Sequence, residues 1–140
     1  MLSKQAECVK NEMLEAVTWR RGLTALEEEW CDLLAVLEDA VGETAASSFA
    51  IAQVVNAERM TLRRQLAEAQ LRNWARICKA PLTPLQHRIL GLRFVQGCTW
   101  GDLVERVGKA KQYLLREHNK ALEILAKTED PAPKKQAKKV

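Results

Sequence analysis

The sequence contains few of the residue patterns that mark enzymes and metal sites. Its 140 residues include only two histidines, and its four cysteines, Cys8, Cys31, Cys78 and Cys98, form no CxxC pair. This spacing indicates neither a zinc site nor a disulfide framework, so we interpret the cysteines as small buried hydrophobic residues. Because no nucleophile, base or metal cluster converges, we expect no enzymatic activity, no cofactor and no bound metal.

Long apolar runs are also missing. No stretch approaches the roughly 18 to 20 apolar residues that span a bilayer. The opening residues MLSKQAECVKNEM lack the apolar core of a signal peptide, so we expect a cytoplasmic protein. Hydrophobic residues make up 47% and charged residues 29%, which fits a soluble chain with one domain or two small helical units.

Charge is unevenly distributed along the chain. Residues 1–79 carry 10 Lys or Arg and 12 Asp or Glu, whereas residues 80–140 carry 12 and 6. The second part therefore has a net charge of +6 and the first part −2. A concentrated basic face favours a partner rich in phosphate, although on charge alone a solvated helix face fits equally well.

The apolar residues recur at helical spacing, and no run alternates as a strand would, so the sequence predicts an all-α protein. We expect a first helix over 4–21 that ends near Gly22. A second helix begins at a capping box formed by Thr24 and Glu27 and ends at Gly42. No Gly or Pro interrupts residues 43–79, which predicts one long helix of about 50 Å.

We interpret residues 1–79 as a packing and oligomerisation region and expect a homodimer. The long helix can pack on the first two helices, line a dimer seam, or both.

Residues 80–127 predict three shorter helices. Ala80-Pro81 breaks the long helix, and Thr83-Pro84-Leu85-Gln86 has the cap, proline and glutamine of a helix start. Thr99 and Asp102 predict the next start, and Gly108 predicts a tight turn before a last helix over 110–127. The polar, proline-containing residues 128–140 predict a disordered basic tail.

Three short helices with a glycine turn before the last one indicate a helix-turn-helix, whose last helix enters the major groove of DNA. Five residues of that helix recur at intervals of three and four and should point inward: Leu114, His118, Ala121, Leu122 and Leu125. The residues expected to face DNA are Lys109, Lys111, Gln112, Tyr113, Arg116 and Lys120. Lys and Arg can donate to guanine, Gln can pair with adenine, and Lys109 in the turn would lie beside phosphate.

The segment LTPLQHRILGLRFVQGCTWGDLVERVGKAKQYLLREHNKALEIL, residues 82–125, is similar to region 4 of bacterial sigma-70 factors. It most resembles the small phage and prophage regulators of the ArpU and RinA type. The resemblance implies a DNA-binding regulator of transcription. Two positions depart from the family pattern, Val104 in place of Ala and Ala110 in place of Ser or Thr.

We therefore expect a sequence-specific protein that binds double-stranded DNA, and the resemblance implies a transcriptional regulator of phage or prophage type. The alternative is a protein-interaction module that engages RNA polymerase or a phage protein, with the acidic segment Glu27-Glu28-Glu29-Trp30 as the docking face. A DNA-packaging subunit is a third possibility, but such proteins usually carry the DNA motif first in the chain.

Overall fold

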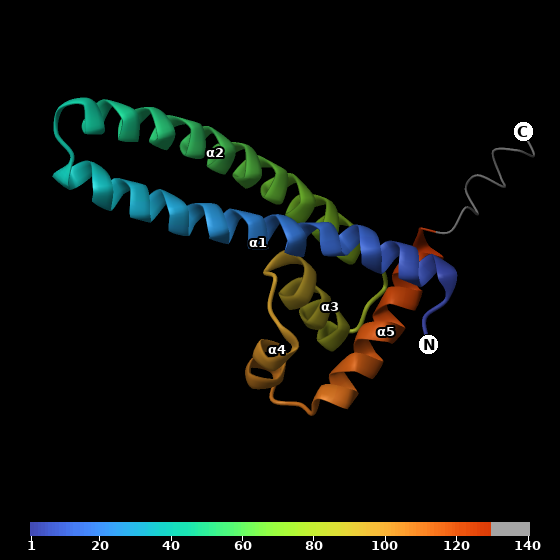
Figure 1. Ribbon diagram of the computed structural model, residues 1–140. Coiled ribbons are helices and arrows are strands. Elements are labelled where there is room, and N and C mark those ends of the chain that lie inside the picture. The colour runs from blue at the N-terminus through green and yellow to red at the C-terminus, as the bar shows by residue number, and fades with distance from the viewer. Residues whose placement is uncertain (130–140) are drawn as a thin grey trace, which may run out of the picture.

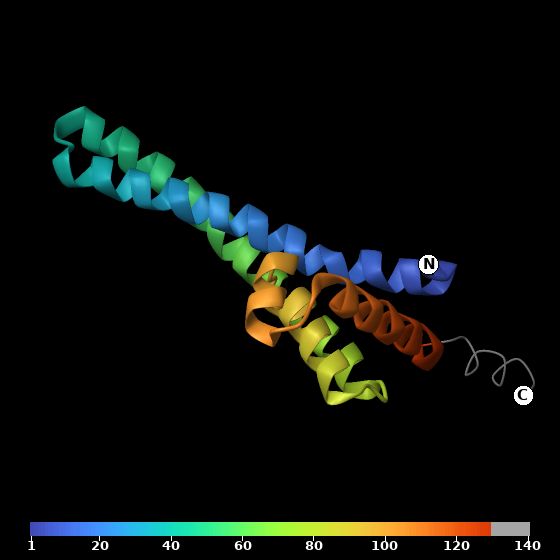
Figure 2. The same ribbon diagram turned by 90° about the horizontal axis from the view of Figure 1, so that it is seen from below.

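The computed structural model describes residues 1–129, and within this range all regular structure is helical. Its elements are α1 (Lys4–Asp39), α2 (Gly42–Lys79), α3 (Pro84–Leu90), a π-helical turn η1 (Gly91–Val95), α4 (Trp100–Val107) and α5 (Lys111–Thr128). Helices α1 and α2 form a long antiparallel hairpin, and the three shorter helices gather at one end of it (Figures 1 and 2). The prediction of an all-α fold is confirmed, whereas the predicted tail lies almost entirely in residues 130–140, outside the described residues.

Helix α1 runs without a break through Gly22, so the predicted end at this glycine is wrong. Glycine costs a helix interior about 1 kcal/mol relative to alanine but ends a helix only where the backbone turns away. At Gly22 the helix lies directly against α2. A Cβ atom added to Gly22 would be 3.6 Å from Cδ1 of Leu62. Thr24 accordingly caps nothing, and its hydroxyl donates to the carbonyl of Arg20 at 2.9 Å.

The hairpin turn and α2 agree with the sequence prediction. Ala40 and Val41 separate the two long helices, and Gly42 takes a left-handed φ of 61° as α2 begins. Helix α2 then continues for 38 residues to Lys79 and ends before Pro81. None of the described helices is both long and apolar enough to cross a bilayer.

The main hydrophobic cluster lies where the hairpin meets the shorter helices. It joins α1, α2, α3, η1 and α5 through Ala6, Val9, Met13, Ile77, Leu90, Phe94, Ala121, Leu122, Leu125 and Ala126. A second cluster holds α3, η1, α4 and α5 together through Ile89, Leu92, Cys98, Leu103 and Leu114. Between α1 and α2 a small third cluster contains Ala16, Leu66 and Ala69. No residue from 18 to 51 is buried, so the far part of the hairpin has no closed core of its own.

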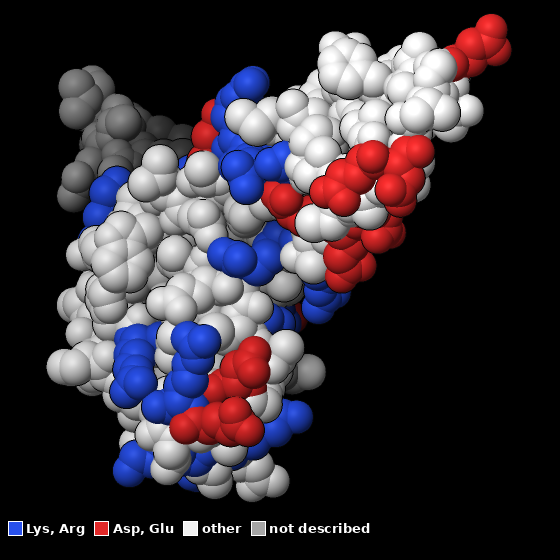
Figure 3. Space-filling view, turned by 90° about the vertical axis from the view of Figure 1, so that its left-hand side faces the viewer, with Lys and Arg blue, Asp and Glu red and all other residues white. Residues whose placement is uncertain are grey.

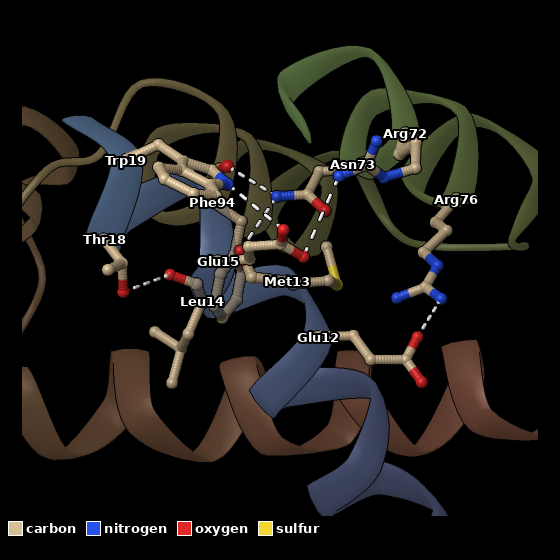
Figure 4. Close-up of polar contacts among 10 residues, drawn as sticks. All are labelled: Glu12, Met13, Leu14, Glu15, Thr18, Trp19, Arg72, Asn73, Arg76 and Phe94. Atoms are coloured by element: carbon tan, nitrogen blue, oxygen red, sulfur yellow. Dashed lines mark hydrogen bonds and ion pairs between the residues drawn. The ribbon is translucent and has the colours of Figure 1, made fainter. Parts of the chain in front are cut away.

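Polar contacts also fasten the hairpin to the shorter helices. Asn73 of α2 is 4% exposed, and its Nδ2 donates to the carbonyls of Met13 (3.0 Å) and Phe94 (2.9 Å), which links α2 to α1 and η1 (Figure 4). At the start of α1, the amide and hydroxyl of Ser3 donate to the carboxylate of Glu123 in α5 at 2.8 and 2.6 Å. These bonds connect residues that are far apart in the sequence.

The interpretation of all four cysteines as buried residues is wrong for three of them. Cys98 is buried, whereas Cys8, Cys31 and Cys78 are exposed, and all four are free. The reason is that α1 and α2 each have neighbours on only part of their circumference. A cysteine at helical spacing next to leucines can therefore still face the solvent.

Candidate nucleic-acid interface

Helix α4 and the turn that follows it are set by local signals. The Thr99 hydroxyl accepts from the Asp102 amide, and the Asp102 carboxylate accepts from the Thr99 amide, both at 3.2 Å. At the other end Gly108 has a φ of 74°, and its amide donates to the carbonyl of Val104. A left-handed conformation of this kind favours glycine. The predicted cap and the predicted glycine turn are both confirmed.

The orientation of α5 is fixed by its buried face. The five residues predicted to point inward are all buried: Leu114, His118, Ala121, Leu122 and Leu125. Leu114 packs in the same cluster as Leu103 of α4, whereas Leu122 and Leu125 pack in the cluster that contains Met13 of α1. The opposite face of the N-terminal half of α5 is consequently turned to the solvent.

The side chains predicted to contact DNA all lie exposed on the turn or on α5: Lys109, Lys111, Gln112, Tyr113, Arg116 and Lys120. Three of them occupy the first turn of the helix, and Arg116 follows one turn later. The guanidinium of Arg116 lies 5.9 Å from the centroid of the Tyr113 ring. The structure thus brings donors of hydrogen bonds and an aromatic ring together at one helix end.

Lys120 differs from the other cations because it forms an ion pair with an acidic residue of its own helix. Its Nζ lies 3.2 Å from Glu117, whose other carboxylate oxygen accepts from Nε2 of Gln86 at 3.3 Å. Glu117 therefore faces α3. Among residues 1–129, Lys109, Lys111 and Arg116 form no ion pair.

Two arginines that were not predicted from the sequence as DNA contacts lie beside this surface. Nη2 of Arg88 in α3 donates to the carbonyl of Arg106 at 3.0 Å, and Nη1 of Arg106 donates to Gln96 at 3.1 Å. Arg106 could have been found, because it precedes Gly108 by only two residues. No neighbouring sequence pattern indicates Arg88, because Arg88 contacts the end of α4 only in the folded chain. Figure 3 shows Lys and Arg grouped with a few acids at the lower end of the molecule, where Figure 1 places α4 and the start of α5.

The N-terminus of α5 has no side-chain cap. Ala110 has the extended backbone of a cap residue, but its side chain accepts no hydrogen bond. The first amide groups of a helix lack partners within the helix, and the helix dipole gives them a partial positive charge. An anion placed there would be stabilised by these amides together with Lys109 and Lys111.

His118 is a core residue. Burial lowers its pKa from the ordinary value of 6.5 to about 4, so the imidazole is neutral at pH 7. Its ring stacks at 5.6 Å on Phe94 and meets Trp100 edge-on at 4.9 Å. Nδ1 lies 2.9 Å from Oδ1 of Asn119.

Part of the acidic segment of α1 is used inside the hairpin. Glu27 pairs with Arg59 and Arg63 of α2, both at 3.2 Å, and the Arg59 guanidinium lies 5.1 Å from the ring centroid of Trp30. Glu28 and Glu29 remain exposed. The segment therefore offers an external partner only part of the surface expected from the sequence.

No protein-family model, no curated protein and no solved structure matches this chain.

Proposed function

We propose that α3, η1, α4 and α5 form a helix-turn-helix unit that binds double-stranded DNA, with the N-terminal half of α5 in the major groove. The observation that carries the proposal is the exposed group of Lys111, Gln112, Tyr113 and Arg116 on a helix whose opposite face is fixed in the core. A helix held in this way presents its side chains in one orientation, as base recognition requires.

The charges around this group support contact with phosphate. Lys109, Lys111 and Arg116 form no ion pair among the described residues, so DNA would not have to displace an acid from them. Arg88 and Arg106 add two exposed cations nearby. Such contacts release counterions and make binding salt-dependent.

The side chains can be assigned different roles. Arg116 and Gln112 carry the groups that form bidentate bonds to guanine and adenine, and the Arg116 guanidinium lies 5.9 Å from the centroid of the Tyr113 ring. Lys109, Lys111 and the uncapped amides of α5 suit phosphate. Lys120 contributes less than the sequence suggested, because Glu117 neutralises it.

Within this proposal the chain acts as a transcriptional regulator of the kind found in phages and prophages, as the resemblance of residues 82–125 to sigma-70 region 4 implies. The alternative is an interaction module for RNA polymerase or a phage protein. That alternative is weakened by the engagement of Glu27 and Trp30 within the hairpin.

The test is fluorescence anisotropy of the full chain with a random duplex pool at two salt concentrations, followed by selection and sequencing of the bound DNA. We expect binding to fall as salt rises, with a log–log slope of about −0.9 for each phosphate contact. Arg116→Ala should cost about 1–3 kcal/mol on the selected site and relax the preference at one base position. Lys111→Ala should weaken all sequences about equally.

The matched control is Lys4→Ala, which removes an exposed lysine at the start of α1. It should leave the affinity for the selected site within about twofold, since it lies outside the proposed interface. If no duplex binds near physiological salt, or if Arg116→Ala and Lys4→Ala have the same effect, the DNA-binding proposal is wrong. A protein partner retained by a Lys111, Gln112 and Arg116 triple variant would favour the alternative.

A further inference from the structure

Helix α2 carries a second apolar stripe that lies exposed along the helix, with α3 in contact at Trp74. It advances by alternating steps of four and three residues, the spacing of a coiled-coil seam. Its positions are 46, 50, 53, 57, 60, 64, 67, 71, 74 and 78. All ten are exposed, and only Gln53 and Arg64 are polar.

This stripe, hereafter the outer seam, is separate from the face that α2 uses within the chain. The buried residues of α2 are Ala52, Val55, Leu66, Ala69, Asn73 and Ile77, which face α1 and the shorter helices. On the outer seam, by contrast, Met60 is 49% exposed, Leu71 68% and Trp74 44%. Large apolar side chains aligned on one exposed face are typical of a protein–protein contact.

We propose that the outer seam binds a second copy of this chain, with the two α2 helices antiparallel. Three alanines and Gln53 occupy its first half, from Ala46 to Ala57, whereas the large Leu71 and Trp74 lie in its second half. A two-fold axis between positions 60 and 64 places each large residue opposite a small or flexible one, Trp74 on Ala50 and Leu71 on Gln53. Alternation of large and small side chains allows two helices to pack closely.

Charge supports the same direction. Residues 22–58 contain eight Asp or Glu and no Lys or Arg, whereas residues 59–79 contain six Lys or Arg and one Glu. An antiparallel pair brings the acidic end of each hairpin beside the basic part of its partner. In that part Arg64 and Lys79 form no ion pair within residues 1–129, whereas the other four arginines already pair with acids of the chain. A parallel pair would place the two acidic ends together and Trp74 against Trp74. Like charges in contact oppose association.

The arrangement also fixes where the two C-terminal units lie. Helix α3 packs beside Trp74 through the Trp74–His87 ring contact. In the proposed dimer Trp74 lies opposite residue 50 of the second copy. At about 1.5 Å per helical residue the two Trp74 residues are about 36 Å apart along the seam. The dimer rests on the outer seam alone and does not require DNA binding.

The first test is the mass of the full chain in solution by sedimentation equilibrium. We expect a species of twice the 15.8 kDa chain mass that dissociates in Leu71→Glu. The matched control is Ile51→Glu, which makes the same kind of change at a position 53% exposed on α2 but at least about 100° around the helix from every residue of the outer seam. Circular dichroism verifies that both variants remain helical. A wild-type monomer at all concentrations, or equal dissociation of both variants, overturns the proposal.

The second test reports the direction of pairing. In a chain that retains Cys78 but has Cys8, Cys31 and Cys98 replaced by alanine, Ala46→Cys should form an intermolecular disulfide with Cys78 of the second copy under mild oxidation. Ser47→Cys, one residue off the seam, is the control and should cross-link at least tenfold less. Peptide mass spectrometry that finds 46–46 and 78–78 links in place of 46–78 links would show a parallel pair and overturn the proposal.

Discussion

The far part of the hairpin and the C-terminal unit are both helical, but they are stabilised in different ways. The C-terminal unit buries Ile89, Leu90, Phe94, Leu103 and Leu114 in continuous clusters, whereas no residue from 18 to 51 is buried. In the hairpin, arginines of α2 pair with glutamates of α1. On the C-terminal surface, Lys109, Lys111 and Arg116 have no acidic partner within residues 1–129, and Lys120 pairs with Glu117.

This difference indicates a division of tasks. A region whose charges are paired internally but whose apolar side chains are exposed is suited to contact with another protein chain. A region with a closed core and unpaired cations is suited to hold a fixed surface against an anionic partner.

Removal of a core side chain should affect the two regions very differently. Leu122→Ala empties a site with 0% exposure and should lower the free energy of unfolding by about 2–5 kcal/mol. The matched change Leu34→Ala, at a position 42% exposed in the hairpin, should cost less than about 0.5 kcal/mol. Urea unfolding measures both. Equal losses would show that the hairpin is as tightly packed as the C-terminal unit.

The bonds of Asn73 should couple the two regions. Asn73→Ala leaves the Phe94 carbonyl without its side-chain donor in a buried position, and it should cost about 1–3 kcal/mol. Hydrogen exchange should in addition show faster opening of η1 and of the first turns of α1, since Asn73 bonds to both. Unchanged exchange at both elements would contradict this role.

Acid should destabilise the C-terminal unit through His118. Its pKa of about 4 in the folded chain lies below the ordinary value of 6.5, so the unfolded chain takes up the proton first. The resulting loss of stability is absent well above pH 6.5 and grows as the pH falls towards 4. Between pH 7 and pH 5 the chain should lose about 2 kcal/mol more than His118→Phe, which cannot titrate. Parallel pH profiles of the two chains would exclude this cause.

A cap on α5 should stabilise the proposed interface helix. Ala110 has φ −63° and ψ 145°, which a serine cap also adopts. Ala110→Ser should therefore raise the free energy of unfolding by about 1 kcal/mol. Ala110→Val provides no hydroxyl and is the control. If both variants unfold at the same urea concentration, the end of α5 gains nothing from a cap.

The exposed ion pairs of the hairpin should contribute least. Arg72 and Glu15 approach only to 3.8 Å, and their side chains are 57% and 50% exposed. A double-mutant cycle with alanine at both positions should give a coupling below about 0.5 kcal/mol. A larger coupling energy would show that this ion pair stabilises the hairpin more than exposed ion pairs usually do.

Local signals made much of the C-terminal unit predictable. Thr83 and Gln86, Thr99 and Asp102, and Gly108 each act within one turn of the chain, so their effect can be predicted from neighbouring residues alone. The inward and outward faces of α5 also followed from spacing, because a helix with one buried side has a regular pattern.

What the sequence did not reveal depends on contacts between distant residues. Gly22 continues a helix because α2 lies beside it, and Asn73 is buried because two carbonyls from other elements meet it. Arg88 joins the basic surface only through the packing of α3 against the end of α4. The exposure of Cys8, Cys31 and Cys78 reflects how few neighbours the hairpin has, which spacing alone does not record.

The bond between Ser3 and Glu123 has a consequence for synthesis on the ribosome. It joins residues 120 positions apart, and Ala6, Val9 and Met13 pack against the same late helix. While the chain is being made, the start of α1 has no α5 to cover it, although the hairpin itself can already form. Its apolar face therefore stays open to chaperones or to other nascent chains until α5 has left the exit tunnel.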